Sequence, residues 1–372
     1  MRVITLISLY VVLNLVLCIP AANAQLQPDT IGQETMSAPA ENWFISKTGA
    51  GAYIYDGLSG EMQGMLSLAG FDAPSVQAYG PRREFYAAES YYSRRVRGDR
   101  TDVVTIYDYE NLSPVAEIEI PKKIAVLSFA GHLGLTGNGR HLIVFNMTPA
   151  QSVSIVDVEN RNFVGELSTP GCAIIMPTGE DDFLMICGDG TLQLIQLDQS
   201  GEEANRVRSE QFFVVEEDAV YDRPVRTEDG WLLISHAGKA FDVTRDGTQI
   251  MISEWSILSD ADVEEKWLPG GGQLKTVHQN LGLLYILMHQ GGEFTHHEPG
   301  TEIWVFDVNQ RRRIARIELE VAARNVMVTQ ESEPKLIVSD TEGGLHVYDA
   351  RQMKLERTIE DPGPSTSLLV DF

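Results

Sequence analysis

The chain has 372 residues, of which 43% are hydrophobic, so it is long and apolar enough to bury a large core. Its formal net charge is -24 at pH 7, which argues against nucleic acid and anionic membrane surfaces as partners. The 32 glycines indicate a turn-rich globular chain, and the composition carries no sign of disorder.

Residues 1–24 predict an export signal peptide that is not part of the fold. Arg2 provides a positive start, and residues 3–19 are almost wholly apolar. Ala22 and Ala24 are small residues at the positions that a signal peptidase reads. We therefore expect cleavage after Ala24 and a periplasmic protein. A retained membrane anchor is the alternative interpretation.

The remainder of the chain divides into a short arm and one large domain. Residues 25–41 are polar and predict an extended N-terminal arm, and residues 42–372 are the predicted folded domain. Both ends of this domain, residues 42–46 and 367–372, have the composition of strands. We expect these two ends to pair with each other and to close the fold.

One pattern recurs along the domain: a short apolar run that ends in an acid, then a turn, then a return run of alternating residues. In its clearest copy, residues 103–121, Asp108 ends the first run and Ile118 and Ile120 share one face of the return run. The alternation predicts a β-hairpin with one buried face, and the aspartate can accept hydrogen bonds from backbone N–H groups of the turn. Seven copies are found, the fourth and fifth of them degenerate, with the acids Asp56, Asp108, Asp157, Asp198, Asp242, Asp307 and Asp349.

The spacing of these acids predicts the architecture. Most are separated by about 40–50 residues, the length of one four-stranded propeller blade. The gap from Asp242 to Asp307 is longer and predicts an insertion over residues 255–272, in which Ser259 can cap a short helix with Asp262. We therefore predict an all-β fold, a seven-bladed β-propeller in which stacked blades supply the core and ring closure removes exposed edges.

Two cysteines, Cys172 and Cys187, remain when Cys18 leaves with the signal peptide. An even pair in an oxidising compartment predicts a disulfide, which here would join neighbouring strands of one hairpin. Two free buried thiols are the alternative.

Residues 94–102 are a dense basic stretch in this acidic chain. A docking patch for an acidic partner is one interpretation. The other, which we favour, is a solvated hairpin loop whose arginines pair with Asp99 and Asp102, because surface charge runs usually contribute little.

The sequence contains no nucleophile elbow, no His-Glu-x-x-His motif and no phosphate-binding loop. The nearest approach to a site is a glycine-rich stretch in which His289, Glu293, His296 and His297 could hold a metal. Adjacent histidines on an extended loop tend to diverge, so a solvated or partner-facing loop is favoured. We predict no catalytic, cofactor-binding or metal-binding residue on this chain.

Several motifs resemble the heavy chains of quinoprotein amine dehydrogenases, those of methylamine and of aromatic (aralkyl) amine dehydrogenase. The resemblance covers most of the domain and is closest to the aromatic-amine member. It is carried by residues 94–104, 152–158, 171–172 with 186–190, 255–258, 267–271, 288–296 and 302–305.

This resemblance implies a periplasmic assembly of two heavy and two light chains. The light chain would carry tryptophan tryptophylquinone and the catalytic base, oxidise a primary amine to an aldehyde and ammonia, and pass electrons to a blue-copper protein such as azurin or amicyanin. The tryptophans of the present chain are then expected to pack in the blades. They are Trp43, Trp231, Trp255, Trp267 and Trp304.

In that family an aromatic residue of the heavy chain is expected near the substrate channel, and Trp43, Phe44 and Phe71 are equal candidates for it. The competing interpretation of the whole chain is a stand-alone exported propeller. It would be either a metal-dependent lactonase-like hydrolase or a binding scaffold.

Overall fold

The computed structural model of the chain describes residues 35–49, 51–68, 75–360 and 362–372. The predicted signal peptide, most of the predicted arm and Phe71 lie outside these residues. The described part is built almost entirely of β-strands, with short helices in its loops: η1 (Gly80–Arg82), η2 (Ala130–His132), α2 (Val215–Asp218) and α3 (Asp260–Glu264). None of these helices has the length and apolarity that a membrane crossing requires.

Five of the sheets have four antiparallel strands each. The first is β28 (Leu368–Asp371), β1 (Trp43–Lys47), β2 (Gly51–Asp56) and β3 (Met62–Ser67). The second is β4 (Val76–Tyr79), β5 (Glu84–Tyr92), β6 (Arg100–Asp108) and β7 (Pro114–Ile120). The third is β8 (Leu133–Leu135), β9 (His141–Asn146), β10 (Ser152–Asp157) and β11 (Asn162–Ser168). The fourth is β12 (Cys172–Thr178), β13 (Asp182–Cys187), β14 (Leu192–Leu197) and β15 (Glu203–Arg208). The fifth is β16 (Val225–Arg226), β17 (Trp231–Ile234), β18 (Lys239–Asp246) and β19 (Gln249–Ser256).

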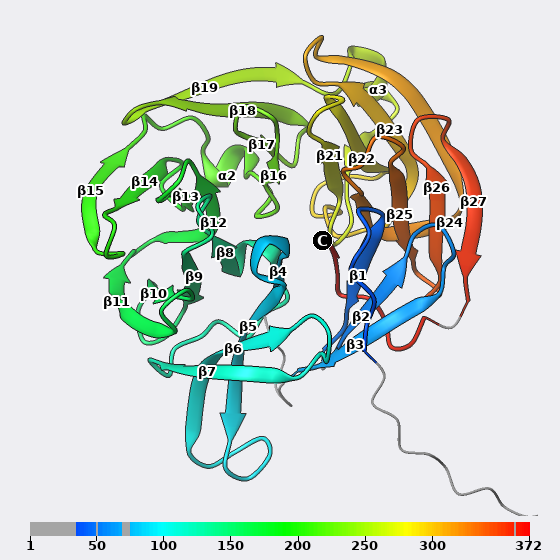
Figure 1. Ribbon diagram of the computed structural model, residues 1–372. Coiled ribbons are helices and arrows are strands. Elements are labelled where there is room, and N and C mark those ends of the chain that lie inside the picture. The colour runs from blue at the N-terminus through cyan, green and yellow to red at the C-terminus, as the bar shows by residue number, and fades with distance from the viewer. Residues whose placement is uncertain (1–34, 50, 69–74, 361) are drawn as a thin grey trace, which may run out of the picture. The chain divides into compact units, whose positions relative to one another are not determined.

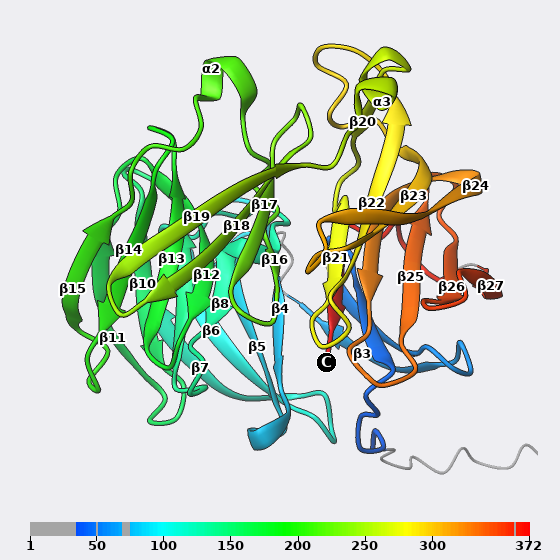
Figure 2. The same cartoon turned by 90° about the horizontal axis from the view of Figure 1, so that it is seen from above.

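The sixth sheet has eight strands. They are β20 (Trp267–Pro269), β21 (Lys275–His278), β22 (Leu283–Gln290), β23 (Gly300–Asp307), β24 (Arg312–Val328), β25 (Lys335–Asp340), β26 (Leu345–Asp349) and β27 (Lys354–Ile359). The predicted all-β propeller class is confirmed, and the sheets of residues 36–372 stand in a ring (Figures 1 and 2). Seven separate sheets are not found, because β24 pairs with β23 through its first half and with β25 through its second half.

Pairing of the two ends of the domain closes the ring, as predicted. β1 is antiparallel to β28, with Phe44 opposite Asp371 and Lys47 opposite Leu368. The last residue, Phe372, packs edge-on against Trp43 with ring centroids 6.1 Å apart. The C-terminal strand therefore supplies the innermost strand of a sheet whose other strands come from the N-terminal end.

The repeat aspartates fix their turns in six of the seven copies. In the first copy, Oδ1 of Asp56 accepts hydrogen bonds from the backbone N–H groups of Leu58 and Ser59, at 2.7 and 3.2 Å. The prediction is wrong for Asp242, because β18 continues past it to Asp246; its carboxylate instead lies 2.9 Å from Arg311. The five other turn aspartates are Asp108, Asp157, Asp198, Asp307 and Asp349.

The predicted insertion contains the capped helix that Ser259 was expected to begin. The Ser259 side chain accepts a hydrogen bond from the Asp262 backbone N–H, and the Asp262 side chain accepts from the Ser259 backbone N–H. This reciprocal capping box satisfies two N–H groups that the helix leaves without partners.

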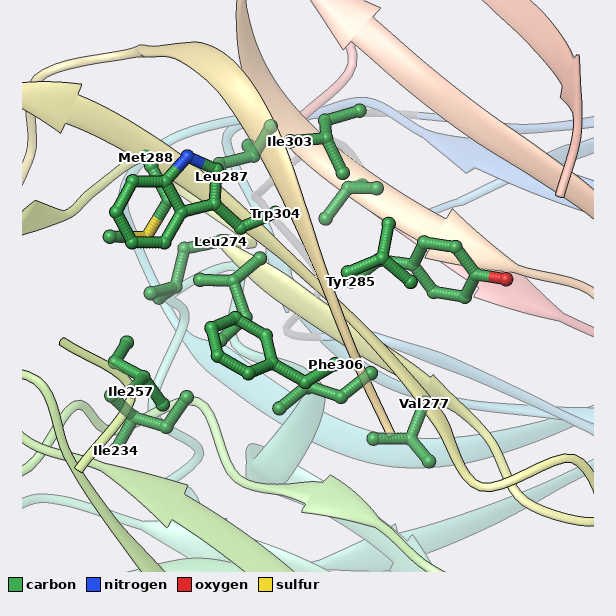
Figure 3. Close-up of a cluster of buried hydrophobic side chains, with 14 of the residues drawn as sticks. Ile234, Ile257, Leu274, Val277, Tyr285, Leu287, Met288, Ile303, Trp304 and Phe306 are labelled. Carbon is green, nitrogen blue, oxygen red and sulfur yellow. The ribbon is translucent and has the colours of Figure 1, made fainter. Parts of the chain in front are cut away.

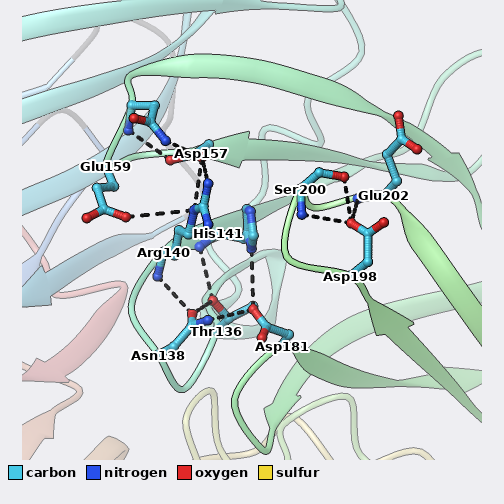
Figure 4. A network of polar contacts seen from close by, with 11 residues as sticks. Thr136, Asn138, Arg140, His141, Asp157, Glu159, Asp181, Asp198, Ser200 and Glu202 are labelled. Carbon is cyan, nitrogen blue, oxygen red and sulfur yellow. Dashed lines mark hydrogen bonds and ion pairs between the residues drawn. The ribbon is translucent and has the colours of Figure 1, made fainter.

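Apolar side chains between neighbouring sheets form the core. The largest cluster joins the fifth and sixth sheets and includes the fully buried residues Trp304, Tyr285 and Leu284 (Figure 3). Polar contacts tie sheets together where their strands turn (Figure 4). Between the third and fourth sheets, Nδ2 of Asn138 donates to Asp181 at 2.5 Å, and Nδ1 of His141 lies 3.6 Å from the same carboxylate.

Candidate functional site

One end of the ring carries the long loops. Because successive strands are antiparallel, the connections β5–β6, β7–β8, β15–β16, β19–β20 and β22–β23 all emerge at the same end. We call this end the loop-rich face; α2 and α3 mark it at the top of Figure 2. The opposite end carries the tight aspartate turns. A partner or ligand therefore has most of its possible contacts on the loop-rich face.

The predicted disulfide is confirmed and lies at the loop-rich face. Cys172, at the start of β12, and Cys187, at the end of β13, are opposite each other with a Cα–Cα distance of 4.0 Å. Nη2 of Arg208, from the outermost strand of the same sheet, lies 3.4 Å from Sγ of Cys172. The bond cross-links the two innermost strands of this sheet, so its role is structural.

The basic stretch forms the end of the β5–β6 hairpin. Arg100 pairs with the fully buried Asp102 at 2.6 Å, which agrees with the predicted pairing for that residue. The prediction is wrong for Arg94, Arg95 and Arg97: all three are exposed, and none takes part in an ion pair with any residue that the structure describes. These arginines lie in the tip of the hairpin together with Asp99, whose backbone is hydrogen-bonded to Ser93.

The histidine stretch does not assemble the predicted set of possible metal ligands. His289, the residue before the last of β22, is buried, with Nε2 3.0 Å from Oγ1 of Thr295. His296 instead stacks on His236 of another loop, with ring centroids 4.3 Å apart, and lies 4.1 Å from the ring of His297. Among the described residues, no three His, Cys, Asp or Glu side chains are grouped as a metal site requires.

The stacked imidazoles disfavour each other's protonation. Burial and the neighbouring His296 ring lower the pKa of His236. Burial and the adjacent His297 lower the pKa of His296. At neutral pH these rings are therefore uncharged and form an aromatic surface together with Tyr221, whose ring lies 4.6 Å from that of His236.

A cavity of about 520 Å³ lies on the ring axis. Its polar lining includes Gln77, Arg226, Gln273, Lys275 and Asp371. Strands at the inner ends of the sheets line it, namely β4, β8, β12, β16, β21, β24 and β28.

Two ionisable groups of this channel are strongly perturbed. Lys275 is 2% exposed, and among the described residues its Nζ has no hydrogen-bond partner. Burial, with a smaller effect of the Arg223 cation, lowers the pKa of Lys275 to about 7. Asp371 lines the channel and is exposed to it, and desolvation by the surrounding protein raises the pKa of its carboxyl group. Close to neutral pH, Lys275 is thus divided between its charged and neutral forms.

A third perturbed group, His132, lies in η2 on the loop-rich face. Its ring is 4% exposed and lies between Phe129 and Phe145, with both centroid distances 4.8 Å. Burial lowers the pKa of His132 to about 4; a hydrogen bond with the Leu127 backbone opposes this shift, and the Arg223 cation adds to it. The native state therefore holds this imidazole neutral over a range in which the unfolded chain protonates it.

We expect the free energy of unfolding to depend on pH because of His132. Between about pH 6.5 and pH 4 the unfolded state binds the additional proton, so the free energy of unfolding falls as the pH falls. His132→Phe keeps an aromatic ring and removes the proton, so it should abolish about 3 kcal/mol of this loss. Urea denaturation from pH 7 to pH 4 measures the difference. The exposed His297→Gln variant is the control, and an unchanged pH profile for His132→Phe would contradict the assignment.

Large apolar side chains are exposed on the loop-rich face. Phe294, in the β22–β23 loop, is 84% exposed, and Val263 of α3 is 60% exposed. Leu127, Val214 and Val215 are exposed on neighbouring loops of the same face. Apolar side chains exposed on a folded surface are available to pack against another molecule.

The tryptophans pack within the blades. Trp304 is fully buried and lies against Trp267, with ring centroids 5.4 Å apart and guanidinium groups over both rings. Trp43 is 4% exposed and forms part of the ring closure. Trp231 and Trp255 are half-buried, and each donates a hydrogen bond from Nε1.

One chain of hydrogen bonds has the composition of a catalytic triad. His346 lies 2.7 Å from Asp340 through Nε2 and 3.1 Å from Oγ1 of Thr358 through Nδ1. Asp340 also accepts hydrogen bonds from three backbone N–H groups of the following turn, so its role is to hold that turn. His346 and Thr358 lie on outer strands, away from the channel, and we assign them a structural role.

Sequence reasoning did not identify His132, Lys275 or Asp371. The one available signal was a lysine inside an apolar strand, Leu274-Lys275-Thr276-Val277. For His132 and Asp371 there was no signal, because their environment comes from residues distant in the chain.

Comparison with known proteins agrees with this architecture. The family model described as "Methylamine dehydrogenase heavy chain (MADH)" matches residues 41–371. The methylamine dehydrogenase heavy chain of Methylophilus methylotrophus is 28% identical over 323 residues, which are 85% of this chain and 78% of that protein. The protein of the same name from Paracoccus versutus is 28% identical over 324 residues, 85% of this chain and 75% of that protein.

Solved structures show the same fold at low identity. Dihydro-heme d1 dehydrogenase NirN in complex with DHE superposes with a TM-score of 0.56 at 15% identity, over 91% of this chain and 68% of that one. The β-propeller domain of Myceliophteria thermophila Cps50 (Swd1) gives a TM-score of 0.58 at 10% identity, over 84% of this chain and 95% of that one. At such identities the likeness concerns the propeller fold alone.

Proposed function

The chain belongs to the methylamine dehydrogenase heavy chain family, and from this premise we propose that it is the heavy subunit of a periplasmic primary-amine dehydrogenase. In this proposal two heavy and two light subunits assemble, and the light subunit carries tryptophan tryptophylquinone and the catalytic base. The amine is oxidised to an aldehyde and ammonia, and the electrons pass to an azurin- or amicyanin-like blue-copper protein. The observation that carries the proposal is the family match over residues 41–371, which span the whole propeller.

The loop-rich face is the surface we propose for the light subunit. Its exposed apolar side chains, above all Phe294, support this because a subunit seated there would remove them from water. The neutral His236–His296 stack lies beside them and adds a flat aromatic surface.

We also propose that the eight-stranded sheet is two blades joined through β24, which makes seven blades in total. The support is that seven inner-edge strands line the channel, with Trp231 of β17 beside them, and that β24 contributes to the outer edge of one blade and to the inner edge of the next. An experimental structure in which β24 pairs with β23 along its entire length would contradict this count.

Co-production with the light subunit tests the function. The two chains should co-purify and reduce a redox dye when a primary amine is added, whereas this chain alone should not. The resemblance to the aromatic-amine enzymes predicts faster reduction with 2-phenylethylamine than with methylamine. Phe294→Ser should lower the amount of light subunit retained, and Leu355→Ser, at an exposed leucine of the outer strand β27, is its matched control. Dye reduction by this chain alone, or no association with the light subunit, would overturn the proposal.

A further inference from the structure

The β5–β6 hairpin is longer than the second sheet needs. β5 and β6 pair over nine positions, from Glu84 opposite Asp108 to Tyr92 opposite Arg100. β4 pairs only with residues Glu84–Ala87 of β5, so the far half of the hairpin has no neighbour on that side. In Figure 1 this part projects beyond the ring of sheets. The tip therefore stands where another molecule can reach it.

The tip is internally ordered. Its backbone is closed by hydrogen bonds from Ser93 N to Asp99 O and from Arg94 N to Arg97 O, both 2.9 Å. The Ser93 hydroxyl also accepts from the Asp99 backbone N–H at 3.0 Å. An ordered tip holds its side chains in place before any partner arrives, so little conformational entropy is lost on binding.

The charges of the tip are unusual for this molecule. Arg94, Arg95 and Arg97 are exposed cations in a chain of net charge -24, and the described residues contain no ion pair that includes any of them. Gathering three like charges costs electrostatic energy in the isolated chain, which an opposite charge on a partner would recover. Exposed Val96, at 61%, adds an apolar contact between the arginines.

The complementary charges lie on the same rim. β7 is the outer edge strand of this sheet, and its Glu117 and Glu119 are exposed and outside every ion pair found among the described residues. Val115, at the bulge of the same strand, is 46% exposed. Tyr91, 40% exposed, lies near the end of β5 that leads into the tip, and its hydroxyl donates to Glu89 at 3.3 Å.

This rim patch, Tyr91, residues 93–99, Val115, Glu117 and Glu119, is self-complementary. Its arginines and glutamates do not pair with each other within one chain, but a two-fold axis would place the tip of each copy against β7 of the other. Such a contact is isologous: it satisfies both charge sets at once and buries the exposed valines and tyrosines between them. A charged rim around a small apolar centre is the usual organisation of a protein interface.

We propose that the rim patch joins two copies of this chain, with the arginine tip of each hairpin docked on the glutamate-bearing edge strand of the other. The proposed function already includes two heavy chains, and this contact identifies the surface through which they would meet. It requires only this chain and does not depend on amine oxidation. It lies on the outer rim and leaves the apolar groups of the loop-rich face free for a different subunit.

Reciprocal charge reversal tests the contact. Variant one carries Arg94→Glu, Arg95→Glu and Arg97→Glu, and variant two carries Glu117→Lys and Glu119→Lys. Each should lose self-association, with the dimer dissociation constant raised about 100-fold, because like charges then face each other. An equimolar mixture of the two variants should restore the dimer, since each charge again meets its opposite. Sedimentation velocity at one fixed ionic strength measures all three samples, with the full chain produced alone and together with its light subunit.

The restored mixture also shows that both variants are folded. A matched control is Arg312→Glu, Arg351→Glu and Lys354→Glu, which makes the same change of charge at exposed positions distant from the patch. It should leave the dissociation constant unchanged. A monomeric wild-type chain, a mixture that stays monomeric, or a first variant that loses the light subunit while remaining a dimer would each overturn the proposal.

Discussion

Removal of Leu368–Phe372 is expected to lower the free energy of unfolding by more than about 5 kcal/mol and to leave a chain that aggregates. These residues include β28, the innermost strand of the first sheet, and bury Leu368 and Leu369 to 1% and 2% exposure. Loss of each buried leucine alone costs about 2–5 kcal/mol. The deletion also removes the Phe372 ring, which contacts three aromatic rings, and exposes the edge of β1 to other chains.

Milder variants keep this expectation measurable if the deleted chain does not fold. Leu369→Ala should cost about 2–5 kcal/mol and Phe372→Ala about 3–5 kcal/mol at most, both read from denaturant midpoints. Leu355→Ala, at an exposed leucine of the outer strand β27, is the control and should change stability by less than about 0.5 kcal/mol. A deleted chain with the thermal midpoint of the full chain would show that ring closure does not depend on β28.

Trp304→Ala should lower the free energy of unfolding by about 3–5 kcal/mol, because it empties a large space in the biggest core cluster (Figure 3). The indole is fully buried, and its Nε1 donates to Glu302 at 2.7 Å. The guanidinium groups of Arg313 and Arg316 lie over the ring, at 4.1 and 4.7 Å from its centroid. Their cation–π contacts are lost together with the packing. Denaturant unfolding followed by far-UV circular dichroism measures the change.

Trp304→Phe separates the contributions. It keeps an aromatic face for the two arginines but loses the Nε1 hydrogen bond and part of the ring volume, so its cost should be less than half that of alanine. Glu302→Gln keeps an acceptor for Nε1 and removes the charge that pairs with Arg316 at 2.8 Å, so it tests the contribution of that ion pair. Equal losses for Phe and Ala at this position would contradict the role assigned to the arginine contacts.

The hairpin signal was reliable where the turn follows directly on the strand. Asp108 and five other aspartates accept turn hydrogen bonds because the acid, the turn and both strands are adjacent in sequence. Asp242 broke the rule because its hairpin turns later, at Asp246-Gly247, and its carboxylate pairs with Arg311 of the β23–β24 connection. The continuity of β24 across two groups of strands depends on both neighbours and not on its own composition.

The candidate site divides in the same way. The cysteine pair and the loop-rich insertion were visible in the sequence because covalent chemistry and helix capping act over few residues. The sequence did not show that Lys275 lacks a hydrogen-bond partner, that His132 is buried between aromatic rings, or that His289 and His296 lie apart. Each of these features depends on which loops meet around the ring.

For this protein, the amino-acid order alone determined the β class, the repeating hairpins and the disulfide, because each rests on contacts between near neighbours or on the chemistry of the residue itself. It also indicated the two closing ends, through the strand composition of each end. Only the tertiary structure decided that three arginines stand unpaired on a projecting hairpin, and that Glu117 and Glu119 share its rim. Charge can be counted from the sequence. Whether a charge finds a partner depends on distances that the packed ring sets.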